Sequence, residues 1–515
     1  MYITRNRNGK MGRIEILKIG LAGLFIATIY LVLSQRIDMG GSGSLLVIAA
    51  MIGGYMALNI GANDVANNVG PAVGSGALTL LGAIAIAAVF EAAGALIAGG
   101  DVVSTIKKGI IDPSLISDSN VFIWLMMAAL LAAAIWLNIA TYFGAPVSTT
   151  HSIVGGVLGA GIAAAGWEIA NWGTMGKIAA SWIISPLLGG IIAAGFLYLL
   201  KRTIIYRADK IAAAQKMVPI LVSLMMWAFS VYLILKGLKK LWKTDIYTAT
   251  FIGFAIAVLV FLIVRPMVKK ASAKLKNDRE SIGDLFVIPL ILSAAMLSFA
   301  HGANDVANAV GPLAAINDAV ANSEVVSKAE IPLWVMMIGA TGIAIGLLLF
   351  GPKLIKTVGS EITELDKMRA FCVALAASIT VIIASQLGLP VSSTHIAVGG
   401  VFGVGFLREY LESNHDRLIA EIRDHYEGEP PEMVEAFLHQ YETADISEQG
   451  ALLAQMKNTR GLLKSDHKRL RKAYRKELVK RSVVIKIAAA WVITVPVAGS
   501  LAALLYFTIR GIMLP

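Results

Sequence analysis

The sequence contains very little cysteine and few charged side chains. Cys372 is the only cysteine among 515 residues, which excludes an intrachain disulfide and a metal site of the CxxC kind. Charged residues make up 15% of the chain and hydrophobic residues 57%, whereas soluble domains carry roughly a quarter charged residues. This composition excludes a disordered chain, a disulfide scaffold, a coiled coil and a collagen, and it indicates a membrane protein.

The formal net charge of +11 does not indicate a nucleic-acid partner. A nucleic-acid-binding protein gathers its Lys and Arg residues on one accessible face. Here they lie in short clusters between long apolar runs, which is typical of a membrane protein that faces an anionic leaflet. We therefore expect membrane lipid, and no nucleic acid, as a partner.

Long apolar runs predict an all-α integral membrane protein with about 12–13 transmembrane segments. A helix needs about 20 mostly apolar residues to cross a bilayer. The runs are too long and unbroken for the alternating strands of a membrane barrel. The predicted crossings are 17–34, 44–68, 76–98, 121–141, 146–165, 177–200, 215–236, 249–265, 284–310, 331–350, 369–388, 391–407 and 484–508.

The distribution of Lys and Arg predicts the orientation. The N-terminus is basic and no small-residue cleavage site follows the first crossing, so we expect a retained helix with the N-terminus in the cytoplasm. The basic loops 201–214 and 265–283 then also lie inside, while the basic loop 236–245 is an exception on the outside. Lys107 and Lys108 fall outside the apolar runs, and we expect both to be solvated. The predicted location is the cytoplasmic (inner) membrane.

Three motifs recur in the same order along the chain. GANDVANNVGP at 61–71 returns as GANDVANAVGP at 302–312, and GAPVSTTH at 144–151 returns as GLPVSSTH at 388–395. KIAASWIISP at 177–186 returns as KIAAAWVITVP at 486–496 after a longer interval, which indicates an insertion in the second copy. The predicted parts are a basic N-terminus with an extra helix (1–43), a first repeat (44–200), linking helices (201–283), a second repeat (284–407), a polar cytoplasmic insert (408–482) and a final helix of the second repeat (483–515).

The two copies run in opposite directions under the predicted orientation, since 44–68 leads inward and 284–310 leads outward. Inverted repeats are typical of secondary transporters, whose substrate sites lie near the midplane where helices are broken. The sequence therefore predicts an inverted-repeat secondary transporter with broken helices.

Asp64 and Asp305 lie at matched positions within apolar runs. A carboxylate at a helix centre costs roughly 2.5–3.5 kcal/mol on insertion scales, so we expect both to face a cavity. Carboxylate and amide oxygens suit a hard cation such as Na⁺, although the asparagines could instead make a polar helix–helix contact. Glu91, a third carboxylate within an apolar run, has two equally favoured roles: cation coupling or a structural hydrogen bond. The flanking asparagines are Asn63, Asn67, Asn304 and Asn308.

The two PVS-x-TH motifs predict helix starts that bind an anion. A proline near the first turn begins a helix, whose free N–H groups and dipole attract phosphate. Ordinary helix capping by Ser or Thr is the alternative. His151 and His395 end the motifs and remain open between hydrogen-bonded core residues and a proton relay. The hydroxyl groups belong to Ser148, Thr149, Thr150, Ser392, Ser393 and Thr394.

The signs of these charges predict symport. Phosphate carries about −1.5 to −2 charges near neutral pH, so two nearby carboxylates would repel it unless cations or protons enter with it. We expect no catalytic residue and no cofactor beyond the co-transported Na⁺ or H⁺. Proton-coupled or metal–phosphate symport, an intramembrane hydrolase and a passive anion channel are the alternatives.

The paired GANDVAN and P-V-S-x-T-H motifs resemble those of the PiT family of inorganic phosphate transporters. The resemblance spans about 44–508 without the insert, and it implies a helical inverted-repeat transporter, commonly dimeric, that takes up orthophosphate with Na⁺ or H⁺. The GANDVAN form is more similar to Na⁺-coupled members. The resemblance implies cation sites near the four asparagines and a phosphate surrounded by Asp64, Asp305, Ser148, Thr149, Ser392 and Ser393.

Overall fold

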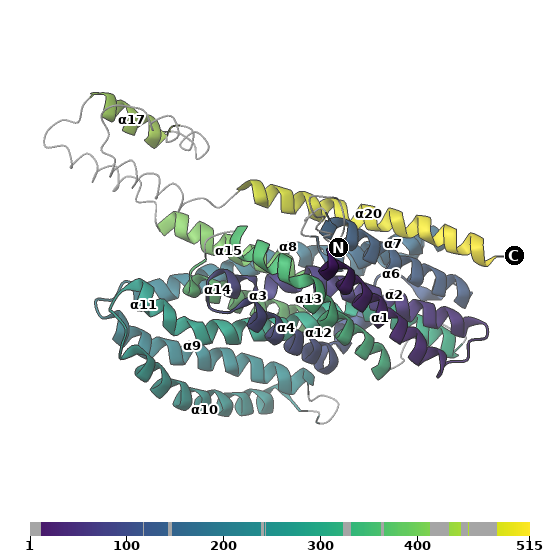
Figure 1. Ribbon diagram of the computed structural model, residues 1–515, viewed down its shortest axis with the longest axis horizontal. Helices are drawn as coiled ribbons and strands as arrows, with labels where there is room; N and C mark the ends of the chain where they lie inside the picture. The colour runs from purple at the N-terminus through teal and green to yellow at the C-terminus, as the bar shows by residue number, and fades with distance from the viewer. Residues whose placement is uncertain are drawn as a thin grey trace.

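A computed structural model describes most of the chain as a bundle of helices (Figure 1). The described residues are 12–116, 118–142, 147–237, 242, 244–322, 331–361, 365–411, 432–443, 452 and 481–514. Every regular element among them is a helix, apart from an isolated antiparallel bridge between Ile111 and Ala170. The prediction of an all-α protein is confirmed.

The helices follow the predicted apolar runs. Before the linking region they are α1 (Arg13–Ser34), α2 (Ser42–Asn63), α3 (Val65–Gly74), α4 (Leu80–Ala98), α5 (Gly100–Lys108), η1 (Pro113–Leu115), α6 (Ser119–Tyr142), α7 (Thr149–Ala165), η2 (Trp167–Ile169), α8 (Trp172–Leu200) and η3 (Lys201–Ile205). The remainder are α9 (Lys210–Tyr232), η4 (Leu233–Gly237), α10 (Ile246–Ser272), α11 (Arg279–Gly283), η5 (Asp284–Phe286), α12 (Val287–Asn322), α13 (Leu333–Glu361), α14 (Lys367–Gln386), α15 (Ser393–Leu411), α17 (Glu432–Thr443) and α20 (Arg481–Met513).

All thirteen predicted crossings are helical, but they are not equally long. In the described part of the chain, 11 helical stretches are long and apolar enough to cross a membrane. The other two, 149–165 and 393–407, are shorter. Both begin at a hydroxyl-rich motif, where the side chains of Ser148 and Ser392 cap the new helix.

Polar caps fix the starts of several helices at the ends of the apolar runs. Asp245 accepts hydrogen bonds from the backbone N–H groups of Tyr247 (2.8 Å) and Thr248 (3.0 Å) and from the Thr248 hydroxyl (2.7 Å) at the start of α10. The hydroxyl bond, assisted by the backbone bonds, holds the pKa of the Asp245 carboxyl below its usual range. Thr79, Asn171, Asp209 and Asp366 cap other helices in the same manner.

Helices of the two predicted repeats pack directly against each other through glycine. A Cβ at Gly61 of α2 would lie 1.9 Å from the Ile343 carbonyl oxygen of α13. A Cβ at Gly302 of α12 would lie 2.1 Å from the Glu91 carbonyl oxygen of α4. The glycine of each GANDVAN motif therefore permits close backbone contact with a helix of the other repeat.

The second halves of the repeats interlock in the same manner. A Cβ at Gly159 of α7 would lie 2.2 Å from the carbonyl oxygen of Gly499 in α20. The counterpart in α15 is Gly403, where a Cβ would lie 2.0 Å from the Gly190 carbonyl oxygen of α8. The two repeats thus share one core, while α9 and α10 lie side by side at one edge of the bundle (Figure 1). The domain boundaries, the inversion of the copies and the membrane sides remain predictions.

The expectation that Lys107 is solvated is wrong. Lys107 of α5 is 7% exposed and forms an ion pair with Asp318 near the end of α12. On the same short helix, Asp101 pairs with Lys236, and the Thr105 hydroxyl donates to the Gly388 carbonyl oxygen at 2.7 Å. These contacts hold α5 against three other parts of the chain.

Most of the predicted insert 408–482 lies outside the described residues. The described part of the insert includes the helix α17.

We expect Gly302→Val to prevent assembly of the bundle. The new side chain would meet the backbone of α4, which no rotamer change can relieve, so the cost should reach at least about 3 kcal/mol, the upper end for overpacking. Size-exclusion profiles and thermal unfolding in detergent measure the effect. Gly195→Ala is the control, since nothing lies within 4 Å of a Cβ there, and equal behaviour of the two variants would contradict the prediction.

Candidate functional site

Four motif segments converge in the middle of the bundle. Asp64 is the single residue between α2 and α3, whereas Asp305 lies within the uninterrupted helix α12. The helix is thus interrupted at the first acidic motif and continuous at the second. Helices α7 and α15 begin beside the two aspartates, which are 1% and 0% exposed.

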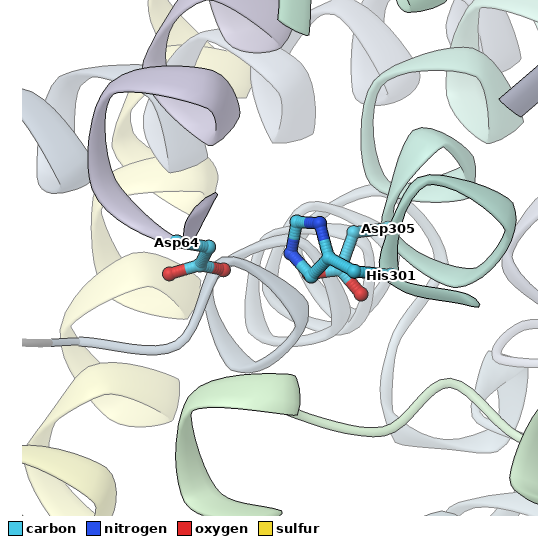
Figure 2. Close-up of side chains that lie close together, drawn as sticks. All are labelled: Asp64, His301 and Asp305. Atoms are coloured by element: carbon cyan, nitrogen blue, oxygen red, sulfur yellow. The ribbon is translucent and has the colours of Figure 1, made fainter. Parts of the chain in front are cut away.

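One hydroxyl group connects the two aspartates. The Thr149 Oγ1 lies 2.7 Å from Asp64 Oδ2, to which it donates, and 3.2 Å from Asp305 Oδ2. A hydroxyl has only one proton to donate, so it satisfies one carboxylate at a time. Figure 2 shows the Asp64 and Asp305 side chains facing the same space, with the His301 ring between them.

The asparagines that follow each aspartate bind the opposite hydroxyl motif. Asn67 donates to Thr394 Oγ1 at 2.8 Å, and Asn308 donates to Thr150 Oγ1 at 3.2 Å and to Thr149 Oγ1 at 3.1 Å. Thr394 in turn lies 3.2 Å from Asp64 Oδ1, to which its hydroxyl donates. The predicted anion and cation residues therefore form one hydrogen-bonded network.

The asparagines that precede each aspartate bond to hydroxyl groups outside the two PVS-x-TH motifs. Asn63 donates to Thr141 Oγ1 at 2.6 Å, and Asn304 donates to Ser385 Oγ at 3.1 Å. Sequence reasoning did not single out Thr141 and Ser385. They are separated by 244 residues, the offset of the hydroxyl motifs, so an alignment of the two repeats with each other would have paired them.

The serines of the two motifs have unequal roles. The hydroxyls of Ser148 and Ser392 accept hydrogen bonds from the backbone N–H groups of His151 (3.2 Å) and His395 (3.3 Å), which is ordinary N-capping. Ser393 Oγ is buried and makes no hydrogen bond in the described structure. Thr149 and Thr394 thus contact the aspartates, Thr150 donates to the Val391 carbonyl oxygen, and Ser148 and Ser392 hold the helix starts. Pro146 lies outside the described residues.

His301 is a member of the site that the sequence did not indicate. Its Nδ1 lies 2.7 Å from Glu91 Oε2, and its Nε2 lies 3.1 Å from Asp305 Oδ2. Asn68 donates to the other Glu91 oxygen at 2.7 Å. All four side chains are buried, so the chain holds a continuous string from Asn68 to Asp305 without water access.

The internal repeat does not duplicate this string of side chains. The position of His301 is occupied by Ile60 in the first copy, and the position of Asn68 by Ala309 in the second. The structural hydrogen bond considered for Glu91 is present, and the cation-coupling role of Glu91 remains a prediction. His301 could have been found by asking which residue differs just before the two GANDVAN motifs.

His151 and His395 meet at the contact between the starts of α7 and α15. Their ring centroids are 4.6 Å apart in an edge-on arrangement, and the Trp182 ring of α8 lies 3.8 Å from that of His151. Both imidazoles are buried. The contact joins the two hydroxyl motifs behind the aspartates, and the choice between a core role and a proton relay remains open.

The arrangement suits cations together with an anion. Asp64, His301 and Asp305 each offer one ligand atom, and these atoms lie within 4.8 Å of one another. The buried acceptors Asp305 Oδ1 and Asn308 Oδ1 have no hydrogen-bond partner in the described structure, and buried acceptors normally have one. Carbonyl and carboxylate oxygens of this kind are ligands for a hard cation such as Na⁺, while the Ser393 hydroxyl, which makes no hydrogen bond in the described structure, can donate to an anion.

The chain is similar to phosphate transport proteins over nearly its full length. The model of the phosphate transporter family (PHO4) matches residues 60–502. A protein of Helicobacter pylori named "Putative phosphate permease" is 53% identical over 508 residues, which cover 96% of this chain and 95% of that protein. A protein of the same name from Pyrococcus abyssi is 41% identical over 366 residues, 70% of this chain and 89% of that protein.

A solved structure supports the same relationship. The structure titled "The sodium-dependent phosphate transporter" superimposes with a TM-score of 0.75 at 32% sequence identity. The superposition covers 91% of this chain and 100% of that one.

We expect Thr149→Val to lower thermal stability more than Thr149→Ser. Valine has a similar shape but removes the hydroxyl that lies between two buried carboxylates, and a lost partner for a buried polar group costs about 1–3 kcal/mol. Serine keeps the hydroxyl and loses only a methyl group. Thermal unfolding of the purified protein in detergent measures the difference, and equal melting temperatures would contradict the bridging role.

Proposed function

The chain belongs to the phosphate transporter family, and on that premise we propose that it takes up inorganic phosphate by symport with Na⁺. It is an integral membrane protein of a phosphate-transporting family. The observation that carries the proposal is the convergence of two buried aspartates with threonine hydroxyls from two helix starts. Such a site presents anion donors and cation acceptors to the same space.

The charges of the site support coupled cations. Ionised Asp64, Asp305 and Glu91 together with a protonated His301 would carry two net negative charges in a buried core. Phosphate adds about −1.5 to −2 more. Moving isolated charges into such an interior costs several kcal/mol each, so the anion needs positive charge that travels with it. We assign Na⁺ to the Asp and Asn oxygens, and phosphate to the threonine hydroxyls and Ser393.

Na⁺ is preferred over H⁺ because the ligands are chiefly oxygens and because the superimposed transporter is titled sodium-dependent. Proton coupling is the alternative, and the string Glu91–His301–Asp305 favours it. A protonated imidazole there could donate to a carboxylate from each nitrogen. We further propose a homodimer in the cytoplasmic membrane with its N-terminus in the cytoplasm, in line with the resemblance and the distribution of basic loops.

Replacing Na⁺ by K⁺ should abolish accumulation of radiolabelled phosphate in proteoliposomes that contain the purified protein. The reason is that an uncompensated anion cannot enter the buried aspartate site. Uptake that persists in K⁺ and collapses with a protonophore would instead identify proton coupling. Downhill flux without accumulation under either gradient would identify a channel and contradict symport.

We expect Asp64→Asn and Asp305→Asn each to reduce the initial rate of phosphate uptake by roughly 100-fold or more. Removing one member of a buried charged network costs about 2–5 kcal/mol, and each 1.4 kcal/mol corresponds to about tenfold. Asp38→Asn is the matched control, because Asp38 is exposed and its side-chain oxygen accepts only a local bond from Gly40. Normal accumulation in either core variant, at normal protein levels, would exclude that aspartate from the transport site.

A further inference from the structure

A seam of polar side chains runs along the contact between α2 and α6 and ends at the transport site. Tyr55, Asn59 and Asn63 are spaced four residues apart on α2, which places them on one face of the helix. Asn138 and Thr141 face them from α6. The chain places Asn63 next to Asp64, so the seam reaches the aspartate directly.

Hydrogen bonds link these side chains into two groups that follow one another along α2. Asn138 Nδ2 lies 2.6 Å from the Tyr55 hydroxyl oxygen and 3.1 Å from Asn59 Oδ1. One turn further on, Asn63 donates to Thr141 Oγ1 at 2.6 Å. Five uncharged oxygen-bearing groups therefore lie between Tyr55 and Asp64.

The asparagines of the seam on α2 are buried, and its other members are partly exposed. Asn63 is 2% exposed and Asn59 is 8% exposed, while Tyr55, Asn138 and Thr141 are half-buried. Polar amide groups are costly in contact with lipid hydrocarbon, so the half-buried Asn138 within a membrane-crossing helix indicates contact with water or protein. Partly exposed polar groups therefore occur along the seam from Tyr55 to Thr141.

The fold does not require polar side chains at these positions. When the two GANDVAN motifs are aligned with each other, Tyr55 and Asn59 of the first repeat correspond to Met296 and Ala300 of α12. When the two PVS-x-TH motifs are aligned with each other, Asn138 corresponds to Ile382 of α14. The second repeat therefore has apolar residues at these three positions, while its pair Asn304–Ser385 is polar and Ser378 of α14 donates to the Ser293 carbonyl oxygen of α12.

We propose that this seam, formed by Tyr55, Asn59, Asn63, Asn138 and Thr141, is the hydrated route by which a monovalent cation reaches Asp64. The inference rests on the proposed cation coupling and adds a path and its residues. Amide, phenol and hydroxyl oxygens can replace water around Na⁺ one at a time. Because they carry no net charge, they hold the ion weakly enough for it to move on to the carboxylate. The second aspartate has no such path in its own repeat.

The variant Asn59→Ala with Asn138→Ile tests the route, because it gives the seam the residues that the second repeat already uses. We expect the Na⁺ concentration for half-maximal phosphate uptake to rise about tenfold or more, a change of about 1.4 kcal/mol. The KM for phosphate at saturating Na⁺ and the maximal rate should stay within about twofold. Thr341→Ala is the control, since this exposed hydroxyl bonds only to its own helix.

A merely structural seam would give a different result. Loss of a helix contact would lower protein yield, thermal stability or maximal rate, and the Na⁺ concentration for half-maximal uptake would stay unchanged. That outcome overturns the proposal. If wild-type uptake itself proves independent of Na⁺, the proposed coupling fails first, and the two failures are thereby distinguished.

Cysteine labelling gives a second test that does not depend on transport. Cys372 is the only cysteine and is fully buried, so Asn138→Cys would introduce one accessible thiol. We expect a membrane-impermeant quaternary-ammonium methanethiosulfonate to modify this cysteine from one face of the membrane, more slowly when Na⁺ is present. Thr341→Cys is the control, since Thr341 is exposed on α13 and lies outside the seam. Modification of Asn138→Cys from neither face, or no faster than that of the control, would overturn the hydrated route.

Discussion

Two carboxylates that share one hydroxyl in a buried core are the constraint on which the rest of the molecule depends. Thr149 lies within hydrogen-bond distance of both Asp64 and Asp305. Two unit charges about 4 Å apart repel by about 4 kcal/mol at an effective dielectric of about 20, which exceeds the roughly 1 kcal/mol gained from a typical hydrogen bond. The site therefore requires positive charge in order to hold both carboxylates ionised. This requirement explains why acidic and hydroxyl-rich motifs occur together in each half of the chain.

The interlocked helices keep this constraint in place. Each GANDVAN glycine contacts the backbone of the opposite repeat, and the hydroxyl motifs bond across to the asparagines of the opposite acidic motif. A membrane protein has little hydrophobic driving force between its helices, so close backbone packing and interhelical hydrogen bonds have to supply the stability. The residues that form the site are in this way the residues that join the two halves.

The sequence predicts the helices and most of the site because its motifs are duplicated and its apolar runs are long. Asp64, Asp305, Thr149, Thr150 and Thr394 meet as expected. His301 differs from its counterpart Ile60 in the first repeat, whereas Thr141 and Ser385 lie in ordinary helical sequence, and only contacts between distant segments give them a role. Lys107 was misjudged for the same reason, since its partner Asp318 lies on a helix far along the chain. Helices α7 and α15 are short because they start at capped hydroxyl motifs inside the apolar runs, and hydropathy alone does not mark those starts.

Glu91 of α4 contacts α12 through both its backbone and its side chain. Its backbone carbonyl lies against Gly302 of α12, and its side chain binds His301, the residue directly before that glycine. Sliding α12 along α4 would break both contacts together, so these two helices are expected to behave as a rigid spine throughout the working cycle. Any rearrangement of the site would then involve the other helices that carry its residues, α7 and α15, whose first turns meet at His151 and His395.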